Sequence, residues 1–201
     1  TDGPLTAMSN LRARTDENGY LRVSLAAGSA VASPFIIGTS YLYFDNTANA
    51  NLNIGHTSAP VYTTGTENLF IGLNSGDACT SWAGNLGIGH SALGSLTTGS
   101  NNTAVGWDSQ FVSVAGNGNT SLGEDALKAV LTGGDNNVGL GYTAGIAITT
   151  GDDNIAIGVQ SLFTNTTGGQ NVAVGHNALN LATGNDSTAI GYGALALTST
   201  G

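Results

Sequence analysis

The sequence predicts an all-β fold, a parallel β-solenoid of ten coils of about 17 residues, and three observations predict it. A short block that ends in glycine recurs at a nearly constant spacing along most of the chain. Apolar residues alternate within each block, as they do in a β-strand. The 201 residues include 31 glycines but are only 8% charged, too few charges to cover the outer faces of helices.

One glycine marks each copy of the repeat. The spacing is 17 residues in seven of the nine steps, with one step of 18 at Gly133-Gly134 and one of 16 near Gly184. Seventeen residues are too few for a propeller blade or a leucine-rich repeat, and they suit one circuit of a slender coil that advances by about 4.8 Å. The repeat glycines are Gly38, Gly55, Gly72, Gly89, Gly106, Gly123, Gly141, Gly158, Gly175 and Gly191.

The three residues before each repeat glycine predict a short strand. The residue next to the glycine is always Ile, Leu or Val, and the one two places earlier is usually apolar or β-branched, as in Ile157 and Ile155. A mostly small residue, such as Ala156, lies between them. We therefore expect strands with one buried face, made by the larger residues.

Ala-Leu pairs follow the repeat glycine by three and four places, as at Ala92-Leu93 and Ala178-Leu179. One circuit offers about three or four apolar side chains to its interior, which barely offsets the entropy lost by ordering 17 residues. We therefore expect chains to associate side by side, three around an axis, with the Ala-Leu pairs packed between them. The predicted assembly is a homotrimer.

An asparagine lies four places before the glycine in most copies. In a stacked coil these side chains would lie above one another, so we expect a ladder of amide hydrogen bonds that satisfies the buried amides. This predicts a structural role for the column. Its members are Asn51, Asn68, Asn85, Asn102, Asn119, Asn137, Asn154 and Asn171.

Residues 1–33 precede the solenoid, which we expect to cover residues 34–201. Two alternating segments flank Asn18-Gly19, a pair typical of β-hairpin turns. The hairpin would either cap the first coil, as solenoids require, or form a joint to an upstream fibre or baseplate protein through Arg12, Arg14 and Arg22. Both interpretations stay open.

The position just after the repeat glycine carries many large side chains and all three histidines. Aromatic faces there suit stacking against sugar rings, which makes Trp107, Tyr142, His176 and Tyr192 the candidate ligand contacts. Identical histidines that meet on a three-fold axis would be an alternative, as metal ligands. The remaining alternative is a ladder of large side chains without a ligand, and we expect no metal or other cofactor.

Composition and motifs exclude several functions. The net charge of −9 disfavours binding to nucleic acid, and the uncharged stretch 23–44 holds too many polar and turn residues for membrane insertion. Cys79 is the single cysteine, so the chain has no internal disulfide. The acidic turn residues favour solvated turns over calcium sites, and the absence of catalytic motifs predicts that the chain is not an enzyme. These acidic residues are Asp77, Asp135, Asp152, Asp153 and Asp186.

The segments NTAVGWDSQ, NIAIGVQSLFTNTTGGQ, NVAVGHNAL and STAIGYGAL resemble the head repeats of trimeric autotransporter adhesins. They resemble still more the TTG-x-x-NTAIGYxAL arrays of phage tail fibres and related surface fibres. The resemblance covers about residues 34–201, although adhesin-head repeats are typically shorter than the repeat of this chain. It implies a trimeric, left-handed parallel β-roll in an elongated attachment fibre.

We therefore expect a segment of a phage tail fibre or similar virion appendage, on the virion or outside the cell, that extends and binds a glycan or protein receptor on a host surface. A bacterial surface adhesin head is one alternative. An ice-binding solenoid with regular threonine rows is another. Against it, neighbours such as Thr97 and Thr98 should point to opposite sides of a strand.

Overall fold

A computed structural model describes residues 11–15, 21–25, 35–37, 40–44, 51–56, 65–79, 83–130 and 133–196, with side chains from residue 51 onward. The chain divides into two units, Thr1–Ala32 and Ser33–Gly201, which are described separately. Strands and turns make up the described residues, and none of these residues is helical. Accordingly, the described part of the chain holds no apolar helix of membrane-spanning length.

The first unit contains one antiparallel pair of strands. Strand β1 (Leu11–Thr15) pairs with β2 (Leu21–Leu25), with Leu11 opposite Leu25. The pair lies where the alternating segments predict a hairpin, while the turn at Asn18-Gly19 falls outside the described residues. Its role as a cap or a joint stays a prediction.

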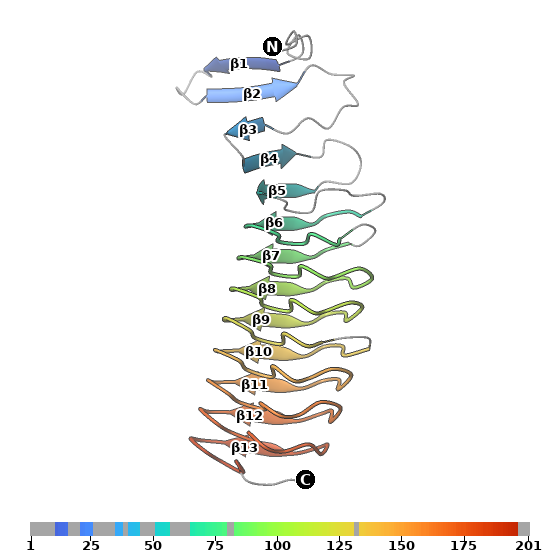
Figure 1. Cartoon of the computed structure of the whole chain (residues 1–201), viewed down its shortest axis with the longest axis vertical. Coiled ribbons are helices and arrows are strands. Elements are labelled where there is room, and N and C mark those ends of the chain that lie inside the picture. Colours follow the sequence, from blue (N-terminus) through green and yellow to red (C-terminus); the bar gives the residue numbers. More distant parts are fainter. Residues whose placement is uncertain are drawn as a thin grey trace. The chain divides into compact units, whose positions relative to one another are not determined.

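The second unit contains one sheet of eleven strands in the order β13 to β3. Nine of them, β5 to β13, are parallel and form a β-solenoid. Figure 1 shows these strands stacked, with the described loops connecting one strand to the next. These strands are β5 (Leu52–Gly55), β6 (Leu69–Ile71), β7 (Leu86–Ile88), β8 (Thr103–Val105), β9 (Thr120–Leu122), β10 (Val138–Leu140), β11 (Ile155–Ile157), β12 (Val172–Val174) and β13 (Thr188–Ile190).

The first predicted copy of the repeat is not a parallel coil. Strand β3 (Phe35–Ile37) pairs antiparallel with β4 (Ser40–Phe44), and β4 pairs antiparallel with β5. The run Ser-Tyr-Leu-Tyr-Phe of β4 has high β propensity and follows β3 after two residues, so it takes the place beside β5 that a parallel coil would have taken. The tenth coil expected from Gly38 is thus replaced by a three-strand meander, and Gly38 itself lies outside the described residues.

The register of the parallel strands follows the repeat through both of its irregular steps. Ile155 pairs with Val172 across a step of 17 residues, Thr120 with Val138 across 18, and Val172 with Thr188 across 16. Equivalent residues therefore stay opposite one another, and the one-residue differences are taken up in the loops.

The strands bury the opposite face from the one expected. Ala156 in the middle of β11 is fully buried, whereas its neighbour Ile155 is 36% exposed and Ile157 is half-buried. The other described solenoid strands follow the same pattern, with the middle residue inside and the two flanking residues outside. The reason is space, because the interior of so short a circuit accepts only a small residue from most of its strands.

The Ala-Leu pairs, expected between chains, lie inside the coil instead. Ala92, Leu93, Ala178 and Leu179 are all fully buried. Leu93 has φ +55°, and the equivalent leucines have similar values, so the backbone turns these side chains inward against the small strand residues. Aliphatic residues three places further on, such as Leu96, complete the core.

Candidate functional site

The repeat glycines are required by close packing between successive circuits. Gly158 has φ +123°, a conformation that is open to glycine and costly for other residues. A Cβ atom on Gly158 would lie 2.6 Å from the carbonyl carbon and oxygen of Gly175 in the next circuit. The same relation links the described repeat glycines from Gly55 onward, so successive circuits leave no room for a side chain along this column.

The predicted asparagine column forms a buried ladder. The backbone N–H of each asparagine from Asn68 to Asn171 donates to the side-chain Oδ1 of the preceding one, over 2.8–3.1 Å. Side-chain Nδ2 atoms also donate to a glycine carbonyl at the end of the same circuit, as Asn154 does to Gly168 over 2.9 Å. The ladder is therefore an internal structural element and is not accessible to a ligand.

The column after the repeat glycine faces outward. Three of the four candidate ligand contacts are strongly exposed aromatic residues, namely Trp107 at 59%, Tyr142 at 48% and Tyr192 at 82%, and His176 is also exposed. His176 stacks on Tyr192 with ring centroids 5.2 Å apart and an interplanar angle of 11°. The structure thus places all four candidates on one column, and two of them, His176 and Tyr192, stack along the solenoid axis.

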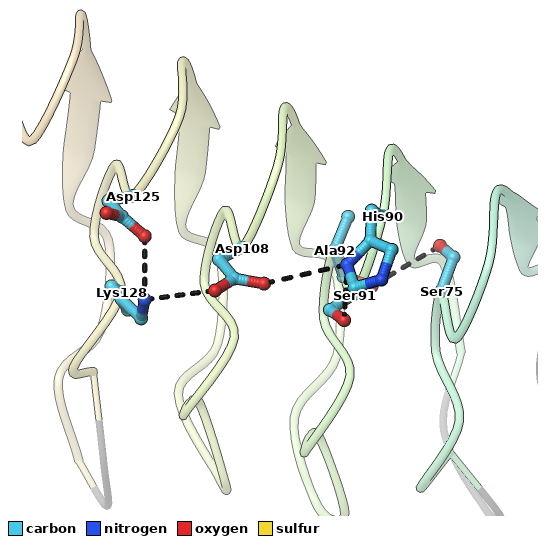
Figure 2. Close-up of polar contacts among 7 residues, drawn as sticks. All are labelled: Ser75, His90, Ser91, Ala92, Asp108, Asp125 and Lys128. Carbon is cyan, nitrogen blue, oxygen red and sulfur yellow. Dashed lines mark hydrogen bonds and ion pairs between the residues drawn. The ribbon is translucent and has the colours of Figure 1, made fainter.

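A second stacked pair in this column adjoins a charged cluster. The ring of His90 lies 4.6 Å from that of Trp107, and His90 Nδ1 shares a 2.9 Å hydrogen bond with Ser91 Oγ. The carboxylate of Asp108 lies 3.9 Å from His90 Nδ1 and accepts a 3.0 Å hydrogen bond from Lys128 Nζ. Figure 2 shows this chain of contacts running across three successive circuits.

Lys128 donates a further 2.8 Å hydrogen bond to Asp125. This bond is the main reason that the pKa of Lys128 is raised above its ordinary value of 10.5, with burial acting in the opposite direction and Asp108 adding to the increase. Lys128 is therefore a fixed cation that joins the turns of two circuits, and its single positive charge is shared by two carboxylates.

The outward residues of the parallel strands form an apolar surface, which we call the strand face. Three of its eighteen residues are threonine, and the other fifteen are Leu, Ile or Val. Leu122 is 52% exposed and Ile190 71%. The strand face consists of Leu52, Ile54, Leu69, Ile71, Leu86, Ile88, Thr103, Val105, Thr120, Leu122, Val138, Leu140, Ile155, Ile157, Val172, Val174, Thr188 and Ile190.

The acidic turn residues do not assemble a metal site among the described residues. No group of three or more His, Cys, Asp or Glu side chains there comes close enough to hold an ion. Two of them instead accept a backbone hydrogen bond from the preceding circuit over 2.8 Å, Asp135 Oδ1 from Asn117 N–H and Asp152 Oδ1 from Asp135 N–H. They form a second, exposed ladder that stabilises the loops.

The threonine rows differ from their predicted geometry. Thr97 and Thr98 lie in a turn, and both hydroxyls donate to the carbonyl oxygen of Val114, over 3.1 and 3.3 Å. Thr149 donates in the same way to the carbonyl of Thr166 over 2.9 Å. The expectation that such neighbours point to opposite sides of a strand is therefore wrong, and these hydroxyls link adjacent circuits.

Fold and surface together define a parallel β-solenoid repeat protein with an apolar strand face and an outward ring column that includes two stacked pairs. No protein-family model, curated protein or solved structure matches the chain.

Proposed function

We propose that the chain is a structural attachment fibre, a homotrimer of left-handed solenoids in a phage tail fibre or similar virion appendage. The strand face carries this proposal. On nine parallel strands it forms a stripe about 38 Å long, apolar in fifteen of eighteen positions. A continuous apolar stripe of this kind is typical of an interface, whereas isolated surface leucines are not.

Association of three chains through the strand face would bury the residues that one coil leaves outside. Charged side chains are absent from the strand face, so its burial leaves no unpaired charge. Cyclic symmetry would bring the three stripes together around one axis, with the loops directed outward. The repeat resemblance favours three chains over two. A trimer of this kind would also suit a bacterial adhesin head, which is the alternative.

The assembly is tested by light scattering on the purified chain, which should give three times the 20.0 kDa mass of one chain. Ile157→Asp should lower the mass and the melting temperature, because it places a charge in the interface. Asn101→Asp is the matched control and should change neither, because Asn101 is exposed and its counterparts in the adjacent circuits are the uncharged Gly84 and Gly118. A wild-type mass of one chain would contradict the proposal.

A gentler variant separates lost association from failed folding. Leu122→Thr with Ile155→Thr places β-branched residues at both positions, as Thr103 and Thr120 already do elsewhere on the strand face. We expect unchanged far-UV circular dichroism and a mass that falls at lower protein concentration than for the wild type. Concentration dependence identical to that of the wild type would exclude the strand face as the interface.

Attachment is assigned to the outward ring column. Exposed aromatic faces with polar neighbours suit a glycan or a protein receptor on a host surface. Trp107→Ala and Tyr192→Ala should reduce binding of the fibre to host cells, whereas Val159→Ala, on the same column, should not. Equal binding by all three variants would remove the ring column from the proposal.

The proposal includes no catalytic role and no cofactor. Degradation of a capsular polysaccharide by the purified chain would overturn that part of it. The ice-binding alternative is weakened by the threonine hydroxyls that donate to neighbouring carbonyls, since these are not free to order water. A thermal-hysteresis assay decides between ice binding and attachment.

A further inference from the structure

One circuit of the solenoid has a polar interior. Between Gly106 and Gly123 the inward side chains are Ser109, Gln110, Ser113 and Ser121, and all four are fully buried. We call these four residues the polar layer. The circuits on either side carry apolar residues at the same places, with Ala92, Leu93, Leu96 and Ala104 before the layer and Ala126, Leu127 and Val130 after it.

The polar layer interrupts the hydrophobic core. The buried apolar side chains form two separate clusters, one before the layer and one after it. The first cluster is Phe70, Cys79, Ala92, Leu93, Leu96 and Ala104. The second is Leu127, Val130, Ala144, Ile148, Ala156, Leu162, Ala173, Ala178, Leu179, Ala182 and Ala189.

Hydrogen bonding satisfies the polar layer only in part. Ser109 Oγ and Ser121 Oγ are 2.5 Å apart, and Gln110 Nε2 donates to Ser121 Oγ over 2.9 Å and to the carbonyl of Thr103 over 3.1 Å. Gln110 Oε1 and Ser113 Oγ are buried without a partner. Each such atom loses its bond to water without replacement, so this circuit is held less strongly than its neighbours.

The asparagine ladder also loses a bond at this level. Before the layer, Asn102 Nδ2 donates to Asn85 Oδ1, and after it Asn154 Nδ2 donates to Asn137 Oδ1. Across the two steps from Asn102 through Asn119 to Asn137, the backbone N–H alone donates to the preceding Oδ1. At the same two steps the inward side chains of the layer are polar, and the side-chain link of the ladder is missing.

Lys128 joins the outside of the same level. Its bond to Asp108 connects the circuit of the polar layer to the circuit that follows, and Asp108 approaches His90 in the circuit before (Figure 2). A partly exposed ion pair stabilises by only a few tenths to about 1 kcal/mol. The ion pair therefore offsets only a small part of the stability that the polar interior loses.

From these observations we infer that the polar layer divides the solenoid into two cooperative units, which open independently and meet between Gly106 and Gly123. In a repeat protein each circuit is stabilised mainly by its neighbours, so the weakest interface sets where the array opens. This device does not depend on the proposed attachment role. The solenoid should therefore open first at the polar layer.

The test is hydrogen exchange of the full chain, with its mass measured on the same samples so that a change of assembly is seen separately. Backbone amides of residues 65–105 and of residues 124–190 should show two different opening free energies, with the change inside the polar layer. One common value on both sides would overturn the inference, whatever the oligomeric state.

The decisive variant carries Ser109→Ala, Gln110→Leu, Ser113→Val and Ser121→Ala, which copy the neighbouring circuits. It should merge the two opening free energies into one and raise protection in the less stable unit by about tenfold or more, because a buried leucine replaces Gln110. Two separate values in this variant would contradict the inference.

Two further variants keep the test decisive if that protein fails to fold. Ser161→Ala is the matched control, a buried serine outside the polar layer, and it should leave two separate values. Lys128→Met should increase opening of the less stable unit by up to about fivefold. Equal effects of Lys128→Met on all amides would show that the solenoid is a single unit.

Discussion

Removal of one rung of the asparagine ladder is the sharpest test of what holds the solenoid together. Asn154 Oδ1 accepts the backbone N–H of Asn171 over 3.1 Å and its Nδ2 over 3.0 Å. Asn154 Nδ2 donates to Asn137 Oδ1 over 3.0 Å and to the carbonyl of Gly168 over 2.9 Å. Asn154→Ala removes all four bonds from a fully buried site.

The magnitude follows from which groups stay satisfied. Asn137 Oδ1 keeps the backbone N–H of residue 154, the Gly168 carbonyl keeps a 3.2 Å bond from Asn165, and Asn171 Nδ2 keeps the carbonyl of Gly184. The Asn171 N–H is the one donor left without a partner, at about 1–3 kcal/mol. The other lost bonds add about 1 kcal/mol between them, since each group retains a partner. We expect Asn154→Ala to lower the free energy of unfolding by about 2–4 kcal/mol.

Urea unfolding measures the loss, as a fall in the transition midpoint with the slope unchanged. The matched control is Asn117→Ala, which removes an exposed asparagine that accepts the N–H of Ser100 and donates to Asp135. There water replaces the lost partners, and we expect a change within about 0.5–1 kcal/mol. A loss for Asn154→Ala no larger than that of the control would refute the view that the ladder is a buried structural element.

Three other changes probe separate parts of the fold. In urea unfolding, Gly158→Ala should lower the free energy of unfolding more than Gly191→Ala does. Both glycines have φ +123°, but only a Cβ at residue 158 would meet the Gly175 backbone. Equal losses would contradict the close packing of the circuits. Leu162→Ala should lower the free energy of unfolding by about 2–5 kcal/mol in melting experiments, with no change in the mass of the assembly, since Leu162 is buried inside the coil. A reduced mass would place Leu162 between chains. The pKa of Lys128 is raised on folding, so the stabilisation that Lys128 provides is complete below pH 10.5 and is lost as the pH rises through the raised pKa. The stability of Lys128→Met should not show this loss at alkaline pH. A pH profile of stability identical to that of the wild type would contradict the role of Lys128.

The period of the repeat determined much of the fold in advance. Identical residues at one spacing can satisfy one another only if they stack in register, so parallel strands and an asparagine ladder followed from the sequence alone. Even the irregular steps keep this register, as the pairing of Thr120 with Val138 shows. The outward ring column was predictable for the same reason, because a column exposed in one circuit is exposed in the rest.

The buried face of the strands could not be read from the pattern. Alternation places Ile155 and Ile157 on one side and Ala156 on the other, but the period of two does not say which side is inside. The choice depends on Leu162, which enters the interior with φ +51°, a conformation that leucine rarely adopts. Propensity places leucine in an extended or helical backbone. It therefore does not predict that Leu162 and its equivalents turn inward and fill the interior.

The meander at the start of the solenoid was missed for a different reason. The segment Pro34 to Gly38 matches the repeat, and the match suggested a parallel coil. A parallel coil needs a full circuit of loop to return to the same edge, but Ser40–Phe44 begins two residues after β3 ends and can only turn back. The short connection between β3 and β4 therefore decided the topology, and aligning the repeats by their glycines takes no account of that length.

The burial pattern also changes what the apolar residues imply about assembly. Because Leu93, Leu162 and their equivalents fill the coil from the loop side, the interior does not need Ile155 or Leu122, and either could be polar without loss to the core. High β propensity alone would be met by threonine, as it is at Thr120. Leu, Ile or Val nevertheless occupies fifteen of the eighteen positions on the strand face. Large apolar residues thus lie on both sides of the sheet, and the outer set, which the core does not require, supports the proposed association through the strand face.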